Sequence, residues 1–162
     1  MALNYTVYST TKLDENSITK VLSNMGMTGV FEKTSSVAKR FSTKDSLGLD
    51  ITFVDIYKGE LEYSENGIEK TFVSDMIVSI RLDKQMEYSS TRKSLIEFII
   101  GIVDISENIL VLFDGDGIIL KLEKGTLKLS NSDFWDIGTC ELLKKEFKKV
   151  DFQKRAQKDW YL

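Results

Sequence analysis

The sequence predicts an α+β fold in a single domain, with a mainly antiparallel sheet and helices packed mostly on one face. Several segments alternate apolar and polar residues with the period of two that is typical of strands. Turn signals join neighbouring strands into hairpins, and no alternating series of strands and helices indicates a parallel sheet. Hydrophobic residues make up 42% and charged residues 29% of the 162-residue chain, as in ordinary globular proteins. We therefore expect one domain over residues 1–152, followed by a basic and aromatic tail at residues 153–162.

The chain begins with a predicted strand and a predicted helix. Residues 3–9 have the Tyr and Val content of a strand. Asp14 is in position to cap a helix that ends at Gly26, because apolar residues recur at helical spacing between them. Residues 27–47 have weak periodicity, and their interpretation stays open between a long loop and an irregular edge strand.

A long hairpin is predicted next. Residues 50–57 and 71–82 both have strand composition, and the second segment alternates apolar with polar side chains. Between them, Asn66-Gly67 is the strongest short hairpin signal, because both positions of such a turn need positive φ.

The second half predicts a buried helix and three further strands. Residues 90–105 are apolar on most sides, so the helix, with Ser89 or Ser90 as its N-cap, is expected to lie buried across the sheet. Strands follow at residues 109–113, 118–122 and 126–130, the last two joined across residues 123–125. Phe134 and Trp135 form a predicted aromatic anchor, and a third helix is expected from about Thr139.

Composition excludes several classes of function. The chain has no histidine, which removes Ser/His/Asp and Cys/His catalytic arrangements and most zinc sites. No glycine-rich phosphate loop is present, so we expect no enzymatic activity and no cofactor. The apolar runs are shorter than the roughly 18 residues that a membrane span needs, and no secretory signal is recognised. A single cysteine, Cys140, fits a reducing compartment, so a cytoplasmic location without membrane contact is expected.

The stretch LFDGDGIILK (residues 112–121) could be either a calcium loop or a turn. An EF-hand loop of about twelve residues needs oxygen ligands at its first, third and fifth positions, glycine at the sixth and glutamate at the last. The best register places Glu123 last but puts the apolar Leu112 first. We therefore expect a hairpin turn in which Asp and Gly supply positive φ angles, and no metal site.

Five acidic residues flank the predicted long hairpin and are our candidate partner-binding residues. Three interpretations remain open for their carboxylates. They are solvated, they contact a basic partner surface, or two of them form a catalytic pair, which would require a buried acid with a raised pKa. The residues are Asp55, Glu60, Glu62, Glu65 and Glu69.

The charge of the chain is unevenly distributed. Residues 144–162 carry a net +4, which leaves −7 for residues 1–143 out of a total of −3. The tail interleaves basic residues with Phe147, Phe152, Trp160 and Tyr161, a pattern typical of nucleic-acid binding and equally of an amphipathic helix that docks on the domain. A nucleic-acid or regulatory binding module is thus an alternative function, although the acidic body disfavours a nucleic acid as partner.

One long segment resembles a known group of proteins. ILVLFDGDGIILKLEKGTLKLSNSDFWD (residues 109–136) combines an apolar strand, a DGD turn, a second hairpin and an NSDFW segment. Together with the opening strand and capped helix, it resembles small immunity proteins of bacterial polymorphic-toxin and contact-dependent inhibition systems, including the Sit-type family. The resemblance implies a protein without catalysis that binds a cognate toxin domain, often a nuclease, and occludes its active site. It identifies no toxin-contacting residue.

Overall fold

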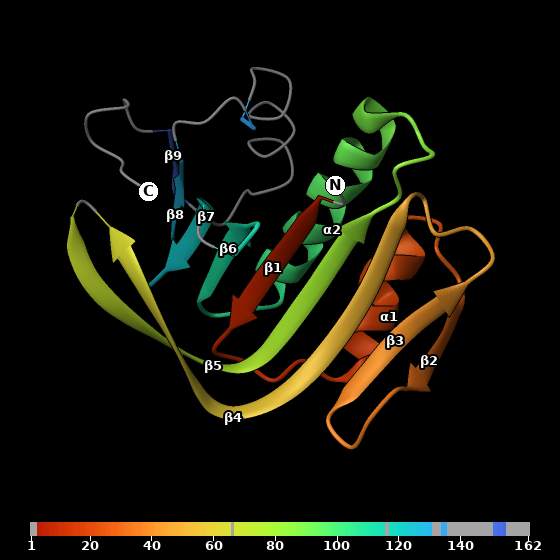
Figure 1. The fold of residues 1–162 in the computed structure, drawn as a ribbon, viewed down its shortest axis with the longest axis horizontal. Helices are drawn as coiled ribbons and strands as arrows, with labels where there is room; N and C mark the ends of the chain where they lie inside the picture. Colours follow the sequence, from red (N-terminus) through yellow and green to blue (C-terminus); the bar gives the residue numbers. More distant parts are fainter. Residues whose placement is uncertain (1–2, 66, 116, 131–133, 136–150, 155–162) are drawn as a thin grey trace.

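A computed structural model describes residues 3–65, 67–115, 117–130, 134–135 and 151–154 of the chain, and for residues 151–154 only the backbone. These residues form one mainly antiparallel sheet with two helices, which confirms that part of the predicted fold class (Figure 1). The helices are α1 (Glu15–Asn24) and α2 (Tyr88–Asp104). The strands are β1 (Asn4–Ser9), β2 (Gly29–Lys33), β3 (Ala38–Thr43), β4 (Leu49–Glu65), β5 (Ile68–Leu82), β6 (Ile109–Phe113), β7 (Gly117–Glu123), β8 (Thr126–Leu129) and β9 (Asp151–Lys154).

The described strands follow the order β2-β3-β4-β5-β1-β6-β7-β8-β9 across the sheet. All neighbouring strands are antiparallel except β8 and β9, which are parallel. Both helices pack against the core-facing side of the central strands and contact each other, because Gly101 of α2 leaves room for Val21 of α1. Alternate side chains of β1, β4 and β5 point to the other side of the sheet, away from both helices.

The ends of the helices agree only in part with the sequence. The predicted cap of α1 is confirmed, since the Asp14 carboxylate accepts a hydrogen bond from the Ser17 amide at 2.9 Å. The predicted end at Gly26 is also confirmed by its φ of +84°. The predicted cap of α2 is wrong, because Glu87 takes the extended N-cap conformation and the helix begins at Tyr88.

Residues 27–47, left open by the sequence, contain the hairpin of β2 and β3. The Phe31 ring packs edge-on against Phe41 and Phe53, with ring centroids 5.3 and 5.6 Å apart, which ties the hairpin to the core. The Ser35 hydroxyl accepts hydrogen bonds from two amides of the turn. Aromatic contact between distant residues therefore stabilises an element whose local pattern is weak.

The long hairpin of β4 and β5 is bent. The pairing register shifts between Asp55 and Gly59 of β4, where Lys58 has a φ of +49°. Beyond this bulge, residues 59–65 and 67–74 form a two-stranded extension that we call the arm. The arm lies at the left of Figure 1. Its inner face packs on the side of β6 and β7 opposite to α2, in a second apolar cluster of Phe72, Leu110, Leu112 and Ile118 with Tyr8, Leu61 and Tyr63.

The predicted turns are present. Glu65 pairs with Ile68, leaving a two-residue loop in which Gly67 has a φ of +72°. Asp114 and Gly115 have φ values of +48° and +97°, so the DGDG stretch contains the expected hairpin turn. Trp135 is 2% exposed, and its indole N–H donates to the Ile119 carbonyl at 2.6 Å, which confirms the aromatic anchor.

The C-terminal predictions are only partly covered by the described residues. The helix expected from about Thr139 and the thiol of Cys140 lie outside them. Strand β9 continues past residue 152, where the sequence predicts that the domain ends. A separate tail, and the nucleic-acid function assigned to it, stay predictions.

Candidate partner-binding surface

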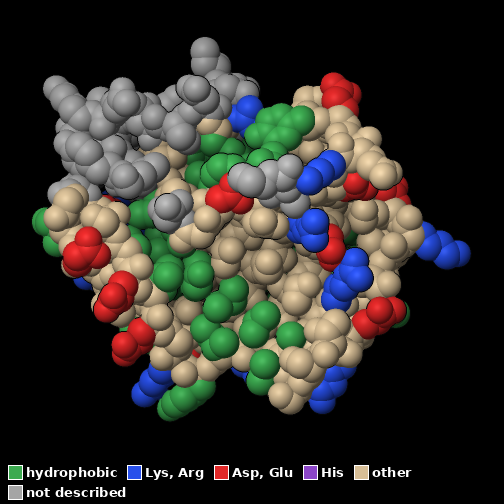
Figure 2. All heavy atoms as spheres, viewed as in Figure 1, with side chains coloured by type: hydrophobic (Ala, Val, Ile, Leu, Met, Phe, Trp, Pro, Cys, Tyr) green, Lys and Arg blue, Asp and Glu red, His purple; other side chains and the backbone are tan. Residues whose placement is uncertain are grey.

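The outer face of the arm presents three carboxylates, which we call the acidic row: Glu60, Glu62 and Glu69. Glu60 and Glu62 lie two positions apart on β4, and Glu69 lies opposite Ser64 on β5, so strand alternation places all three on one face. All three residues are exposed. Side chains on one face of a strand are about 7 Å apart, so the neighbouring carboxylates of the row lie at about that spacing. Figure 2 shows acidic side chains along the left edge of the molecule, over the arm.

Glu65 is on the opposite, inner face of the arm. It is only 7% exposed, and its carboxylate lies 3.4 Å from the ammonium of Lys121 on β7. Lys70, its neighbour across the turn, also forms an ion pair with it. Burial alone would raise the pKa of Glu65, but the hydrogen bond from Lys70 and the charge of Lys121 lower it below its ordinary value. Glu65 is therefore an ionised structural group and does not belong to the acidic row.

Asp55 also lies apart from the acidic row. It is on the core side of the bulge, where its carboxylate forms an ion pair with Lys12 at 3.1 Å. Both side chains are substantially exposed, and such pairs contribute little to stability. Of the five candidate acids, the structure thus brings together Glu60, Glu62 and Glu69 on one exposed face.

Two sequence signals could have separated Glu65 from the others. Position 65 is odd whereas 60 and 62 are even, so an uninterrupted strand places it on the other face. Lys121 is the single charge within the apolar segment IILKL, and a buried lysine needs an ionic partner. Neither signal identifies the partner, because Glu65 and Lys121 are 56 positions apart.

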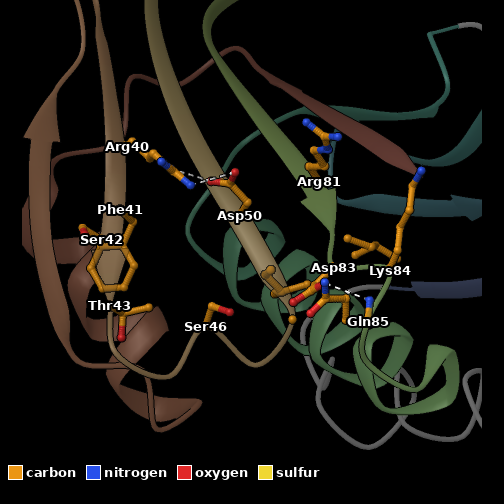
Figure 3. A pocket seen from close by; sticks show the side chains of 13 residues that line it. Arg40, Phe41, Ser42, Thr43, Ser46, Asp50, Arg81, Asp83, Lys84 and Gln85 are labelled. Atoms are coloured by element: carbon orange, nitrogen blue, oxygen red, sulfur yellow. Dashed lines mark hydrogen bonds and ion pairs between the residues drawn. The ribbon is translucent and has the colours of Figure 1, made fainter. Parts of the chain in front are cut away.

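An open polar cleft of about 560 Å³ lies at the other end of the same hairpin (Figure 3). Arg40 spans it and donates two hydrogen bonds to Asp50, at 2.8 and 3.0 Å. Arg81 and Lys84 also line it, and neither forms an ion pair with a described residue. The exposed side of β5 runs from Glu69 to Arg81, so this cleft and the acidic row belong to one continuous sheet surface.

Among the described residues, no group of three or more Cys, Asp or Glu side chains could hold a metal ion. The Asp114 carboxylate instead accepts a hydrogen bond from the Asn4 amide at 3.3 Å, next to the start of β1. None of the helices formed by the described residues is long and apolar enough to span a bilayer.

The fold and its surface define a small α+β protein that displays a charged strand pair and has no metal-binding group among its described residues. Comparison with protein families identifies the family: the one described as SitI3-like matches residues 3–138. The chain therefore belongs to the SitI3-like family, and names of the SitI type indicate immunity proteins of toxin systems. The resemblance seen in the sequence is confirmed. Comparison with curated proteins found no match, and comparison with solved structures found none either.

Proposed function

We propose that this protein is a toxin immunity protein that binds its cognate toxin domain stoichiometrically, occludes the toxin's active site and performs no catalysis. Membership of the SitI3-like family is the observation that carries the proposal. The described surface is compatible with it, because it offers exposed charged side chains on one face of a strand pair. A bacterial cytoplasm is the compartment in which such a protein would meet its toxin.

The acidic row is the proposed contact surface. Exposed carboxylates at regular spacing on a strand pair resemble the repeated negative charges of a nucleic-acid backbone. A nuclease carries a basic substrate cleft, so a nuclease domain is the toxin class that the row fits best. Complementary charge would accelerate the encounter and orient the complex.

The test requires the cognate toxin domain, which would be sought among the genes adjacent to the one that encodes this chain. Purified protein is titrated into a fixed amount of that domain while toxin activity, or nuclease activity where present, is measured. We expect activity to fall linearly and to reach its minimum at one equivalent, and calorimetry to give the same stoichiometry. Full toxin activity in a large excess of the protein would contradict the proposal. An unrelated toxin domain is the control for non-specific inhibition.

The contact surface is tested separately. Replacing Glu60, Glu62 and Glu69 together by glutamine removes three charges and preserves side-chain size. We expect the affinity for the toxin domain to fall by about tenfold or more, since rim charges act mainly through steering and complementarity. The control replaces three exposed acids remote from the arm, Glu15, Glu32 and Asp104, by the corresponding amides. If both triple variants bind like the wild type, the acidic row is not the contact surface.

A further inference from the structure

We infer that Glu65 and Lys121 are positioning residues: their buried ion pair locks the arm onto β7 and thereby sets the direction in which the acidic row faces a partner. This inference rests on the proposed function for its consequence in binding, but the locking of the arm is testable without a toxin.

The arm has few other attachments to the sheet. Strand β1 pairs with β5 only over residues 76–81, and β3 pairs with β4 only over Thr52–Val54, so within the described chain no strand flanks the arm. An isolated two-stranded hairpin is marginally stable in water. Contacts of the inner face must therefore hold the arm in place.

The apolar part of these contacts is large but non-directional. Phe72 and Leu61 pack against Leu110, Leu112 and Ile118 under the arm. Apolar contact favours burial but is non-directional, so it distinguishes poorly between nearby positions of the arm. The apolar contact therefore holds the arm against β6 and β7 but does not fix its exact position over them.

The ionic part is specific to one position. Lys121 is 2% exposed, and its ammonium lies 3.4 Å from Glu65 and 3.4 Å from Glu123. It also lies 5.4 Å from the centre of the Tyr63 ring, on the same inner face of the arm as Glu65. Displacement of the arm would leave the buried ammonium with Glu123 as its carboxylate partner on β7, and losing one of two carboxylates is unfavourable for a buried charge.

Charge is maintained on both partners. Burial would lower the pKa of Lys121, but the hydrogen bond with Tyr63 and the charge of Glu65 raise it above its ordinary value. The pKa of Glu65 is lowered. The ion pair therefore persists across the physiological pH range.

Hydrogen exchange measured by mass spectrometry tests the lock. In Lys121→Met, which removes the charge but keeps an unbranched side chain, and in Glu65→Gln, we expect amides of residues 59–74 to exchange about tenfold faster or more, while amides of β1 and α2 stay protected over the same labelling times. Glu62→Gln is the matched control, because it makes the same chemical change on the outer face of the same strand. Lys121→Arg keeps the charge and should preserve protection. Unchanged exchange of the arm in both Lys121→Met and Glu65→Gln would overturn the inference.

The consequence for binding is measured on the same proteins with the cognate toxin domain. We expect Lys121→Met and Glu65→Gln to bind about tenfold more weakly although the acidic row is intact, because the partner must now order the arm. Lys20→Met, the same substitution at an exposed site on α1, should bind like the wild type. A loosened arm with wild-type affinity would overturn the positioning role. If the wild type does not bind the toxin domain but the variants show the expected faster hydrogen exchange in the arm, the proposed function is refuted and the locking of the arm by the ion pair is retained.

Discussion

Glu62 and Glu65 lie on the same strand and carry the same side chain, yet the structure gives them opposite environments. Glu62 is exposed in the acidic row, whereas Glu65 is buried against Lys121. The difference follows from strand alternation, which sends their side chains to opposite faces. Because one carboxylate is solvated and the other is paired, their contributions to stability should depend differently on pH.

Glu65 should stabilise the fold at neutral pH but not in acid. Its pKa is lowered in the folded protein, so its contribution is present above the unfolded-state value of about 4.3 and is lost as the pH falls through the folded value. We therefore expect the wild type to exceed Glu65→Gln in free energy of unfolding near neutral pH, and the difference to shrink below about pH 4. Urea unfolding at several pH values measures it. A difference that stays constant down to about pH 3 would contradict the assignment.

Lys121 should show the cost of an orphaned charge. Removing one member of a buried ion pair costs about 3 kcal/mol or more, although Lys70 still compensates Glu65 here and favours the lower end. We expect Lys121→Met to lower the free energy of unfolding by that order. The double variant with Glu65→Gln should be less destabilised than the sum of the single variants, because the two residues share one interaction. Additive effects would show that they act independently.

Calcium should leave the DGDG turn unaffected. Gly115 and Asp114 adopt positive φ, and the Asp114 carboxylate faces the Asn4 amide. We expect no change in melting temperature when calcium or a chelator is added, because a ligand stabilises only a fold that binds it. A rise of several degrees in excess calcium would restore the metal-site interpretation. A known EF-hand protein is the positive control.

Residues with local signals were predictable from the sequence. The Asp14 cap, the positive φ of Gly67 and the turn at Asp114 and Gly115 depend on neighbours within a few positions. The inward orientation of Glu65 depends instead on the parity of a long strand and on a lysine 56 positions away. For the same reason, the sequence identified the acidic group but not which of its members lie on one face.

At the scale of elements, the contact between α1 and α2 depends on Gly101. A Cβ atom at this position would lie 2.3 Å from Cγ1 of Val21, far inside contact distance. We expect Gly101→Ala to destabilise the protein by about 1–3 kcal/mol through overpacking. Guanidinium unfolding measures the effect, and Val21→Ala in the same chain should recover part of it. If the two substitutions add without recovery, the helices do not meet at this contact.

Element boundaries were less predictable than element types. The helix at 90–105 was correctly expected to be buried, but it begins at Tyr88 because Glu87, not a serine, takes the cap position. Hairpin β2–β3 was not predicted, because it is stabilised by the packing of Phe31 against Phe41 and against Phe53 of β4, a contact between distant residues that local sequence does not show. Local pattern therefore predicted most elements up to β8, while long-range packing determined their limits and the β2–β3 hairpin.

At the scale of the whole molecule, the two faces of the sheet have different surroundings. The helices cover one face and form the main core, whereas no helix among the described residues covers the other face of β4 and β5, which is the face proposed for contact. Along that face, the exposed carboxylates of the arm lie at one end, and Arg81 and Lys84 lie beside the polar cleft at the other. The cleft itself is mixed in charge, because Asp83 lines it as well. A partner that covers the whole face would be favoured by a basic region opposite the arm, and such complementary charge would favour one orientation of the complex.

Association with the toxin should therefore depend strongly on salt. Charges on an exposed face act over about 8–10 Å at physiological ionic strength, so they steer the encounter more than they hold the complex. We expect the association rate constant to fall steeply with added sodium chloride while the dissociation rate constant changes little, as measured by stopped-flow fluorescence or surface plasmon resonance. The variant with Glu60, Glu62 and Glu69 replaced by glutamine should associate more slowly at low salt and show a shallower salt dependence. Parallel salt curves for the wild type and this variant would place the steering charge elsewhere on the molecule.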